Sequence, residues 1–265
     1  MRSTMIAKTI FYITTWCFLW LPLLAQAQER TIAIDVNKVQ GPFNTFFKTS
    51  IGAGRANEGL RADWQQQLAE LKRDTDFNYI RMHGLLSDDI GVYKIDAQGR
   101  ELYNFQYVDA LYDYILSIGM KPFVELGFMP SALASGDKTI FWWRGNVTPP
   151  HSYEKWETLI KKLTEHWTQR YGAEEVSRWY FEVWNEPNLD GFWAGTQAEY
   201  FKLYAHSARA IKSVNPAYKV GGPATAGAAW IPEMIAYCKT NNVPLDFVST
   251  HAYGVNQGFL DEFGS

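Results

Sequence analysis

Trp179-Tyr-Phe-Glu-Val-Trp-Asn-Glu-Pro-Asn-Leu-Asp-Gly-Phe-Trp193 begins as an aromatic and β-branched run, which is typical of a β-strand. The run stops at Pro187, because proline fixes its own φ and has no N–H for the ladder. Glu186 is therefore expected at the C-terminal end of a strand, before a loop that carries Phe192. A carboxyl group with aromatic neighbours suits sugar chemistry, so Glu186 is a candidate acid/base. A capping or salt-bridging role is the alternative.

Strand-like and helix-like stretches alternate along the rest of the chain. Helical spacing of apolar residues predicts helices over 61–74, 104–119, 152–172, 196–215 and 231–239. Strand-like runs occur at 31–36, 46–51, 77–82, 121–126, 178–184, 219–222 and 245–250. Thr196 to Glu199 has the sequence of a capping box. This alternation predicts parallel βαβ units.

Two folds fit that alternation, a (β/α)₈ barrel and a doubly wound open sheet. A dinucleotide-binding open sheet should carry a glycine-rich fingerprint after its first strand, and Gly52-Ala-Gly54 only begins one. The barrel is favoured by polar and aromatic residues at predicted strand ends, because these ends meet on one face of a barrel, where the active site is built. These residues are His83, Glu125, Asn185, Glu186, His251 and Tyr253.

The predicted fold class is therefore α/β, an incomplete (β/α)₈ TIM barrel. Counted from Phe46, the chain supplies about six of the eight β/α units, whereas a closed barrel takes about 250 residues. We expect the sequence to be a C-terminally truncated form of a longer protein.

The N-terminal segment has the pattern of a secretory signal peptide. Two basic residues, an apolar run over residues 10–25 and the small-x-small site Ala25-Gln-Ala27 predict cleavage after Ala27. An uncleaved membrane anchor is the alternative, but no later stretch approaches the roughly 20 apolar residues of a membrane span. Residues 28–265 are then the N-terminal portion of a catalytic barrel domain in a secreted or periplasmic protein.

Composition argues against several classes of function. Losing residues 1–27 removes two basic and no acidic residues, and leaves 23 basic against 28 acidic residues, a net charge of −5. Such a chain is not expected to bind nucleic acid. Cys17 is lost with the signal, so Cys238 has no intrachain disulfide partner. The five histidines lack metal-ligand spacing. We expect no metal and no other cofactor.

Several motifs together resemble a known family. The stretch Glu182-Val-Trp-Asn-Glu-Pro-Asn-Leu189, followed by Phe192-Trp193, is similar to the acid/base motif of glycoside hydrolase family 39, which contains β-xylosidases and α-L-iduronidases. Asn-Glu-Pro alone is shared by related barrel glycosidase families. Strands two, three and six of the family resemble Tyr79–Leu85, Lys121–Pro130 and Phe247–Tyr253. The likeness extends from about Gly41 to Tyr253, nearly the whole mature chain.

The resemblance implies a retaining glycoside hydrolase, β-xylosidase-like, with Glu186 as the acid/base and a glycoside or oligosaccharide as substrate. Side chains that it places around the sugar are His83, Asn185, His251, Tyr253, Phe128 and Phe192. Glu125 either binds substrate or pairs with Arg81 on the neighbouring strand. The nucleophile should be a Glu that ends a seventh strand beyond residue 265, so the 265-residue chain is expected to be inactive or nearly so.

Two alternatives stay open at the sequence level. One is another Asn-Glu-Pro barrel glycosidase, of the endo-glucanase or mannanase type. The other is a non-catalytic carbohydrate-binding protein, which the absence of a convincing nucleophile supports.

Overall fold

The computed structural model describes residues 31–39 and 41–253. The predicted signal peptide, residues 1–27, lies outside the described residues. The chain divides into two compact units, Met1–Phe43 and Asn44–Ser265. In the described part of the chain, no helix is both long enough and apolar enough to cross a lipid bilayer.

The strand predicted over residues 31–36 is wrong. This segment of the first unit has no regular structure, and the side chains of Ile32, Ile34 and Val36 are exposed. Backbone N–H and C=O groups of a strand need a partner strand. Residues 31–36 have no such partner strand among the described residues.

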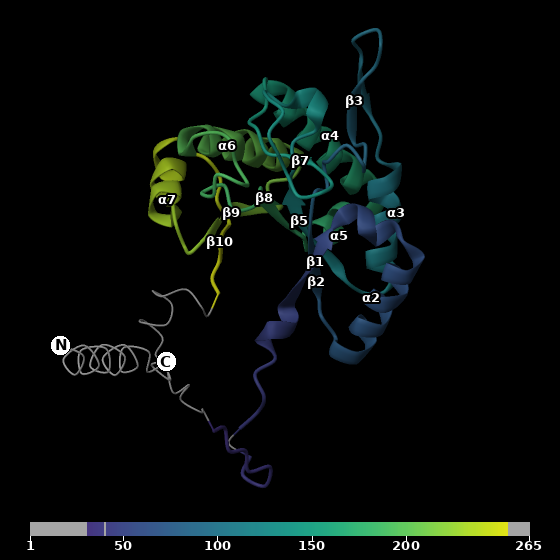
Figure 1. Ribbon diagram of the computed structural model, residues 1–265, viewed down its shortest axis with the longest axis vertical. Helices are drawn as coiled ribbons and strands as arrows, with labels where there is room; N and C mark the ends of the chain where they lie inside the picture. The colour runs from purple at the N-terminus through teal and green to yellow at the C-terminus, as the bar shows by residue number, and fades with distance from the viewer. Residues whose placement is uncertain (1–30, 40, 254–265) are drawn as a thin grey trace, which may run out of the picture. The chain divides into compact units, whose positions relative to one another are not determined.

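The second unit is built on a parallel sheet of six strands (Figure 1). In spatial order they are β1 (Ser50–Arg55), β2 (Tyr79–His83), β5 (Lys121–Leu126), β8 (Tyr180–Val183), β9 (Lys219–Ala226) and β10 (Phe247–His251). Every neighbouring pair is parallel. The spatial order follows the chain order without the reversal that a doubly wound sheet requires. The barrel prediction is confirmed: the sheet provides six strands of an incomplete (β/α)₈ barrel.

Helices connect the strands and lie in an arc around them (Figure 1). The α-helices are α2 (Ala62–Thr75), α3 (Gln106–Ser117), α4 (Tyr153–Tyr171), α5 (Ala173–Val176), α6 (Gln197–Val214) and α7 (Ile231–Thr240). Short 3₁₀ helices are η1 (Phe46–Thr49), η2 (Ala56–Leu60) and η3 (Ser131–Leu133). The apolar face predicted for α4 is buried, and Trp156 on it donates its indole N–H to the Ser207 hydroxyl of α6 at 2.8 Å.

Some predicted boundaries differ from the structure. The first sheet strand begins at Ser50, not at Phe46, and it continues past the predicted end at residue 51 to Arg55. Strand β9 continues four residues past Gly222. Helix α3 begins at Gln106, not at the predicted residue 104, and its N-cap is Phe105; the Asn104 side chain accepts a hydrogen bond from the backbone N–H of Gln106.

Two antiparallel hairpins escaped prediction. They are β3 (Tyr93–Ile95) with β4 (Glu101–Tyr103), and β6 (Thr139–Ile140) with β7 (Gly145–Asn146). Strands of two or three residues are too short to produce a periodic pattern.

The capping box at the start of α6 is confirmed. Thr196 Oγ1 accepts from the Glu199 backbone N–H at 3.2 Å, and the Glu199 carboxylate accepts from the Thr196 backbone N–H at 2.7 Å. We expect Thr196→Ala to lower the free energy of unfolding by about 1 kcal/mol. Thr196→Asp should retain nearly all of it, because aspartate is also a favourable N-cap. Urea unfolding monitored by tryptophan fluorescence measures the free energy of unfolding of both variants. Equal losses in the two variants would contradict the capping role of Thr196.

Side chains on the inner face of the sheet form layers. The first layer is aromatic, with neighbouring ring centroids 5.4 to 5.9 Å apart: Tyr79, Phe123, Tyr180 and Phe247. Side chains two residues apart on a strand point to the same face. The next layer therefore contains the charged side chains of Arg81, Glu125 and Glu182, directly below the strand ends where the candidate site lies.

Cys238 is buried on α7, and burial raises the pKa of its thiol to about 11. Because the thiolate is the reactive form, iodoacetamide at about pH 8 should not label Cys238 in the native protein and should label it rapidly in denaturant. Mass spectrometry measures the two rates. Equal rates would mean that α7 does not pack as the structure shows.

Candidate active site

Glu186 lies just past the end of β8, in a backbone conformation that holds it there. Its φ is +46° and that of Trp184 is +72°, in the left-handed region that costs residues other than glycine about 1–3 kcal/mol. The Glu186 N–H donates to the carbonyl oxygen of Ala224 on β9 at 2.8 Å. Such backbone strain is typical of functional sites, and here it places one carboxyl group above the inner face of the sheet.

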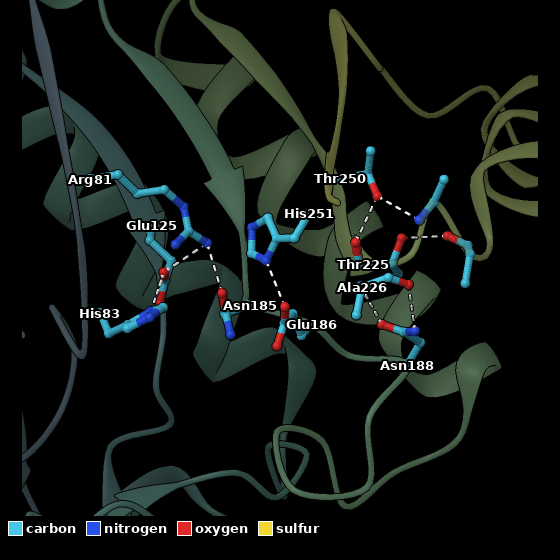
Figure 2. Close-up of polar contacts among 12 residues, drawn as sticks. Arg81, His83, Glu125, Asn185, Glu186, Asn188, Thr225, Ala226, Thr250 and His251 are labelled. Carbon is cyan, nitrogen blue, oxygen red and sulfur yellow. Dashed lines mark hydrogen bonds and ion pairs between the residues drawn. The ribbon is translucent and has the colours of Figure 1, made fainter. Parts of the chain in front are cut away.

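The loop after Glu186 is fastened at two points. The Trp184 indole N–H donates to the Phe192 carbonyl oxygen at 2.7 Å, which closes the loop. Asn188 donates to the carbonyl oxygen of Ala226 and accepts from its N–H, at 3.0 and 2.9 Å, as Figure 2 shows. These contacts hold the loop against β9.

The carboxyl group of Glu186 has one engaged oxygen and one free oxygen. Nδ1 of His251, the last residue of β10, lies 2.8 Å from Glu186 Oε1 (Figure 2). Oε2 has no hydrogen-bond partner among the residues that the structure describes. The side chain is nearly buried, with 11% of its surface exposed. Glu186 can therefore offer a fixed oxygen to a ligand.

Next to this carboxyl group, Arg81 joins three polar side chains, two of which, Glu125 and Asn185, are labelled in Figure 2. Its Nε donates to Glu182 at 2.6 Å, and its Nη2 lies 2.9 Å from Glu125 Oε2 and 3.0 Å from Asn185 Oδ1. Burial acts to lower the pKa of Arg81, but the two carboxylates outweigh it and raise that pKa above its ordinary value. Since the amide oxygen of Asn185 is occupied by Arg81, its NH₂ group remains available as a donor.

These strand ends surround a pocket with a volume of about 350 Å³. Glu186 is the one acidic side chain among the described residues that line it. The lining residues are Gly52, Ala53, Gly54, Arg81, His83, Asn185, Glu186, Phe192, His251 and Tyr253. Six of the predicted site residues thus meet at one pocket, and β1 contributes backbone and small side chains to its wall.

A family model described as glycosyl hydrolases family 39 matches residues 30–262. The chain belongs to this family. It is 51% identical to a β-xylosidase of Caldicellulosiruptor saccharolyticus over 86% of this chain and 47% of that protein. It is 49% identical to a β-xylosidase of Geobacillus stearothermophilus over 80% of this chain and 43% of that protein. The chain spans about half the length of these curated relatives.

A solved structure agrees with the family 39 assignment. The crystal structure of a monomeric β-xylosidase from Caulobacter crescentus CB15 superposes with a TM-score of 0.78 and 48% identity. The match covers 87% of this chain and 46% of that chain. The fold of the family 39 chain is thus the barrel of the solved relative, over the part that the two share.

Two residues that were expected around the sugar do not line the pocket of this family 39 chain. Phe128 is fully buried, and its ring stacks on His83 with centroids 6.1 Å apart. Glu125 is 1% exposed and lies behind His83, where it forms the predicted pair with Arg81. Tyr253 lies at the pocket and is largely exposed.

The position of Phe141 beside the site was not predicted from the sequence. It follows the short strand β6 at a φ of +62°, and its ring stacks on His83 at 6.1 Å and contacts Phe192 at 5.7 Å. The ion pair of Arg81 and Glu182 could have been predicted, because charged residues inside apolar strand runs indicate a buried ion pair. Among the described residues, no group of three or more acidic, histidine or cysteine side chains is arranged to hold a metal ion.

Proposed function

We propose that the complete gene product is a retaining glycoside hydrolase that cleaves β-xylosides, with Glu186 as its general acid/base. The observation that carries this proposal is the Glu186 carboxyl group, with Oε1 against His251 and Oε2 free at the pocket. The names of the relatives, both β-xylosidases at about half identity, support the choice of sugar.

In the first step, Glu186 gives its proton to the glycosidic oxygen as the bond to the sugar breaks. In the second step, the resulting carboxylate takes a proton from the attacking water. Asn185 donates to the hydroxyl beside the reacting carbon, since Arg81 holds its amide oxygen. Phe192 covers the apolar side of the pocket, and Tyr253 stands at its edge.

A retaining reaction also needs a carboxylate that attacks the sugar, about 5–5.5 Å from the acid/base. Glu125 is too deeply buried to reach the pocket, and Glu186 is the one described acidic residue that lines it. We propose that a carboxylate from outside the described residues supplies the nucleophile. A non-catalytic sugar-binding protein would not need one.

The test uses the complete gene product with 4-nitrophenyl β-xyloside and matched glucoside, mannoside and α-L-iduronide substrates. We expect the xyloside to be hydrolysed most efficiently, and ¹H NMR of the first product to show β-xylose before mutarotation. α-Xylose as the first product would refute retention. Sugar binding by calorimetry without any hydrolysis would support the binding-protein alternative.

We also propose that the protein is secreted or periplasmic, on the basis of the signal-peptide pattern that ends at Ala27. Cell fractionation followed by N-terminal sequencing tests this, and we expect the mature protein to begin at Gln28 outside the cytoplasm. An intact Met1 on protein that remains in the cytoplasm would contradict it.

A further inference from the structure

His83 is fixed at the pocket by three neighbours. Its ring packs against both Phe128 and Phe141, with both centroid distances 6.1 Å and interplanar angles of 19° and 28°. Its Nδ1 lies 2.7 Å from Glu125 Oε2. Nε2 has no hydrogen-bond partner in the described part of the chain, and the ring lines the pocket. The nitrogen that can meet a ligand is therefore Nε2.

Glu125 determines which proton the ring carries. Its side chain is completely buried, and Arg81 Nη2 lies 2.9 Å from the same oxygen that contacts His83. A carboxylate oxygen beside a guanidinium accepts hydrogen bonds and has none to donate. The hydrogen bond to His83 must then come from Nδ1–H. In the neutral imidazole this leaves an unprotonated Nε2, which is an acceptor.

We propose that Glu125 is a positioning residue that makes His83 Nε2 a hydrogen-bond acceptor for one hydroxyl group of the bound sugar. This rests on the proposed function, because the ligand is taken to be a xyloside. Glu125 acts through His83 and does not contact the sugar. Together with the Asn185 amide, the pocket then offers one acceptor and one donor, both oriented by contacts to the Arg81–Glu125 pair.

The acceptor role has a consequence for the substrate. Asn185 is placed for the hydroxyl beside the reacting carbon, so His83 takes the hydrogen of the 3- or 4-hydroxyl. Fluorine at that position cannot donate. An Nε2 left without a donor should then lower kcat/KM by about 10- to 100-fold for one of the two monofluoro analogues. The other analogue should lose much less.

Two variants of Glu125 separate positioning from simple packing. In Glu125→Gln, the amide oxygen can replace Oε2, so Nδ1–H keeps its acceptor and the tautomer is retained. In Glu125→Leu, no acceptor remains and the ring is free to move its proton to Nε2. Thermal unfolding of both variants identifies any loss of folding, and only folded variants are compared.

The first readout is ¹⁵N NMR of histidine-labelled protein, with the His83 signals assigned from a His83→Gln variant. We expect a protonated Nδ1 and an unprotonated Nε2 in wild type and in Glu125→Gln, and loss of this state in Glu125→Leu. An Nε2–H tautomer in the wild type would overturn the proposal, even if no Glu125 variant folds. This readout needs no substrate, so it stands apart from any failure of the proposed function.

The second readout is kcat/KM for 4-nitrophenyl β-xyloside and its 3- and 4-deoxyfluoro analogues. Comparing one analogue across variants cancels the electronic effect of fluorine. Discrimination against one analogue should persist in Glu125→Gln and fall to within about 3-fold in Glu125→Leu. Undiminished discrimination in a folded Glu125→Leu variant would overturn the proposal. Absence of xyloside hydrolysis in the wild type would instead refute the proposed function.

Discussion

Replacing Glu186 by glutamine is expected to lower kcat/KM for xylobiose by about 10²–10⁴-fold, the usual contribution of a positioned proton donor. Xylobiose has a poor leaving group that must be protonated as the bond breaks. The dinitrophenolate of 2,4-dinitrophenyl β-xyloside leaves without a proton, so its kcat/KM should change little. Its kcat should still fall, because the second step loses its base. Steady-state kinetics with the two substrates measure the difference.

Glu233 provides the matched control for this experiment. It lies on the exposed side of α7, outside the residues that line the pocket. Glu233→Gln removes one carboxylate and should leave kcat/KM for both substrates unchanged. An equal loss for xylobiose and the dinitrophenyl substrate in Glu186→Gln would show that Glu186 is not the proton donor.

Replacing Arg81 by methionine is expected to lower the free energy of unfolding by about 3–5 kcal/mol, because the change leaves buried carboxylates without their cation. Glu125 and Glu182 have 0% and 2% of their side-chain surface exposed. Methionine keeps most of the apolar stem of the arginine, so the loss reports chiefly on the ion pairs. Urea unfolding at 25 °C measures it, with tryptophan fluorescence and circular dichroism as two probes of one transition.

Arg178 is the control for Arg81. It pairs with Glu174 at 2.6 Å, but the two side chains are 52% and 86% exposed. Arg178→Met should therefore change stability by about 0–1 kcal/mol. If Arg81→Met lowered the free energy of unfolding by no more than Arg178→Met does, the buried ion-pair network below the pocket would be contradicted.

The six parallel strands could be predicted because each has a run of apolar residues that ends at a glycine, a proline or a polar residue. The same kind of pattern produced the error at residues 31–36. Alternating apolar residues indicate a strand but do not show whether a partner strand is available. The late start of β1 at Ser50 reflects a 3₁₀ turn that carries no periodic signal.

Residues at the site were predictable to the extent that they end strands. His83, Asn185, Glu186 and His251 meet at the pocket because parallel strand ends converge. For Glu125 the sequence left two roles open, and the structure selects the pair with Arg81 because the Glu125 side chain is buried behind His83, a position that depends on tertiary packing. Phe141 was missed because a long loop brings it back over His83, and loop paths depend on tertiary contacts.

Azide rescue of a Glu186→Ala variant tests the role of Glu186 most directly. Azide can occupy the space left by the carboxylate and attack the glycosyl-enzyme from the side where water normally enters. With 2,4-dinitrophenyl β-xyloside as substrate, we predict faster turnover with added azide and β-xylosyl azide as the product, identified by ¹H NMR. No rescue, or formation of α-xylosyl azide as expected after loss of a nucleophile, would contradict the assignment of Glu186 as the acid/base.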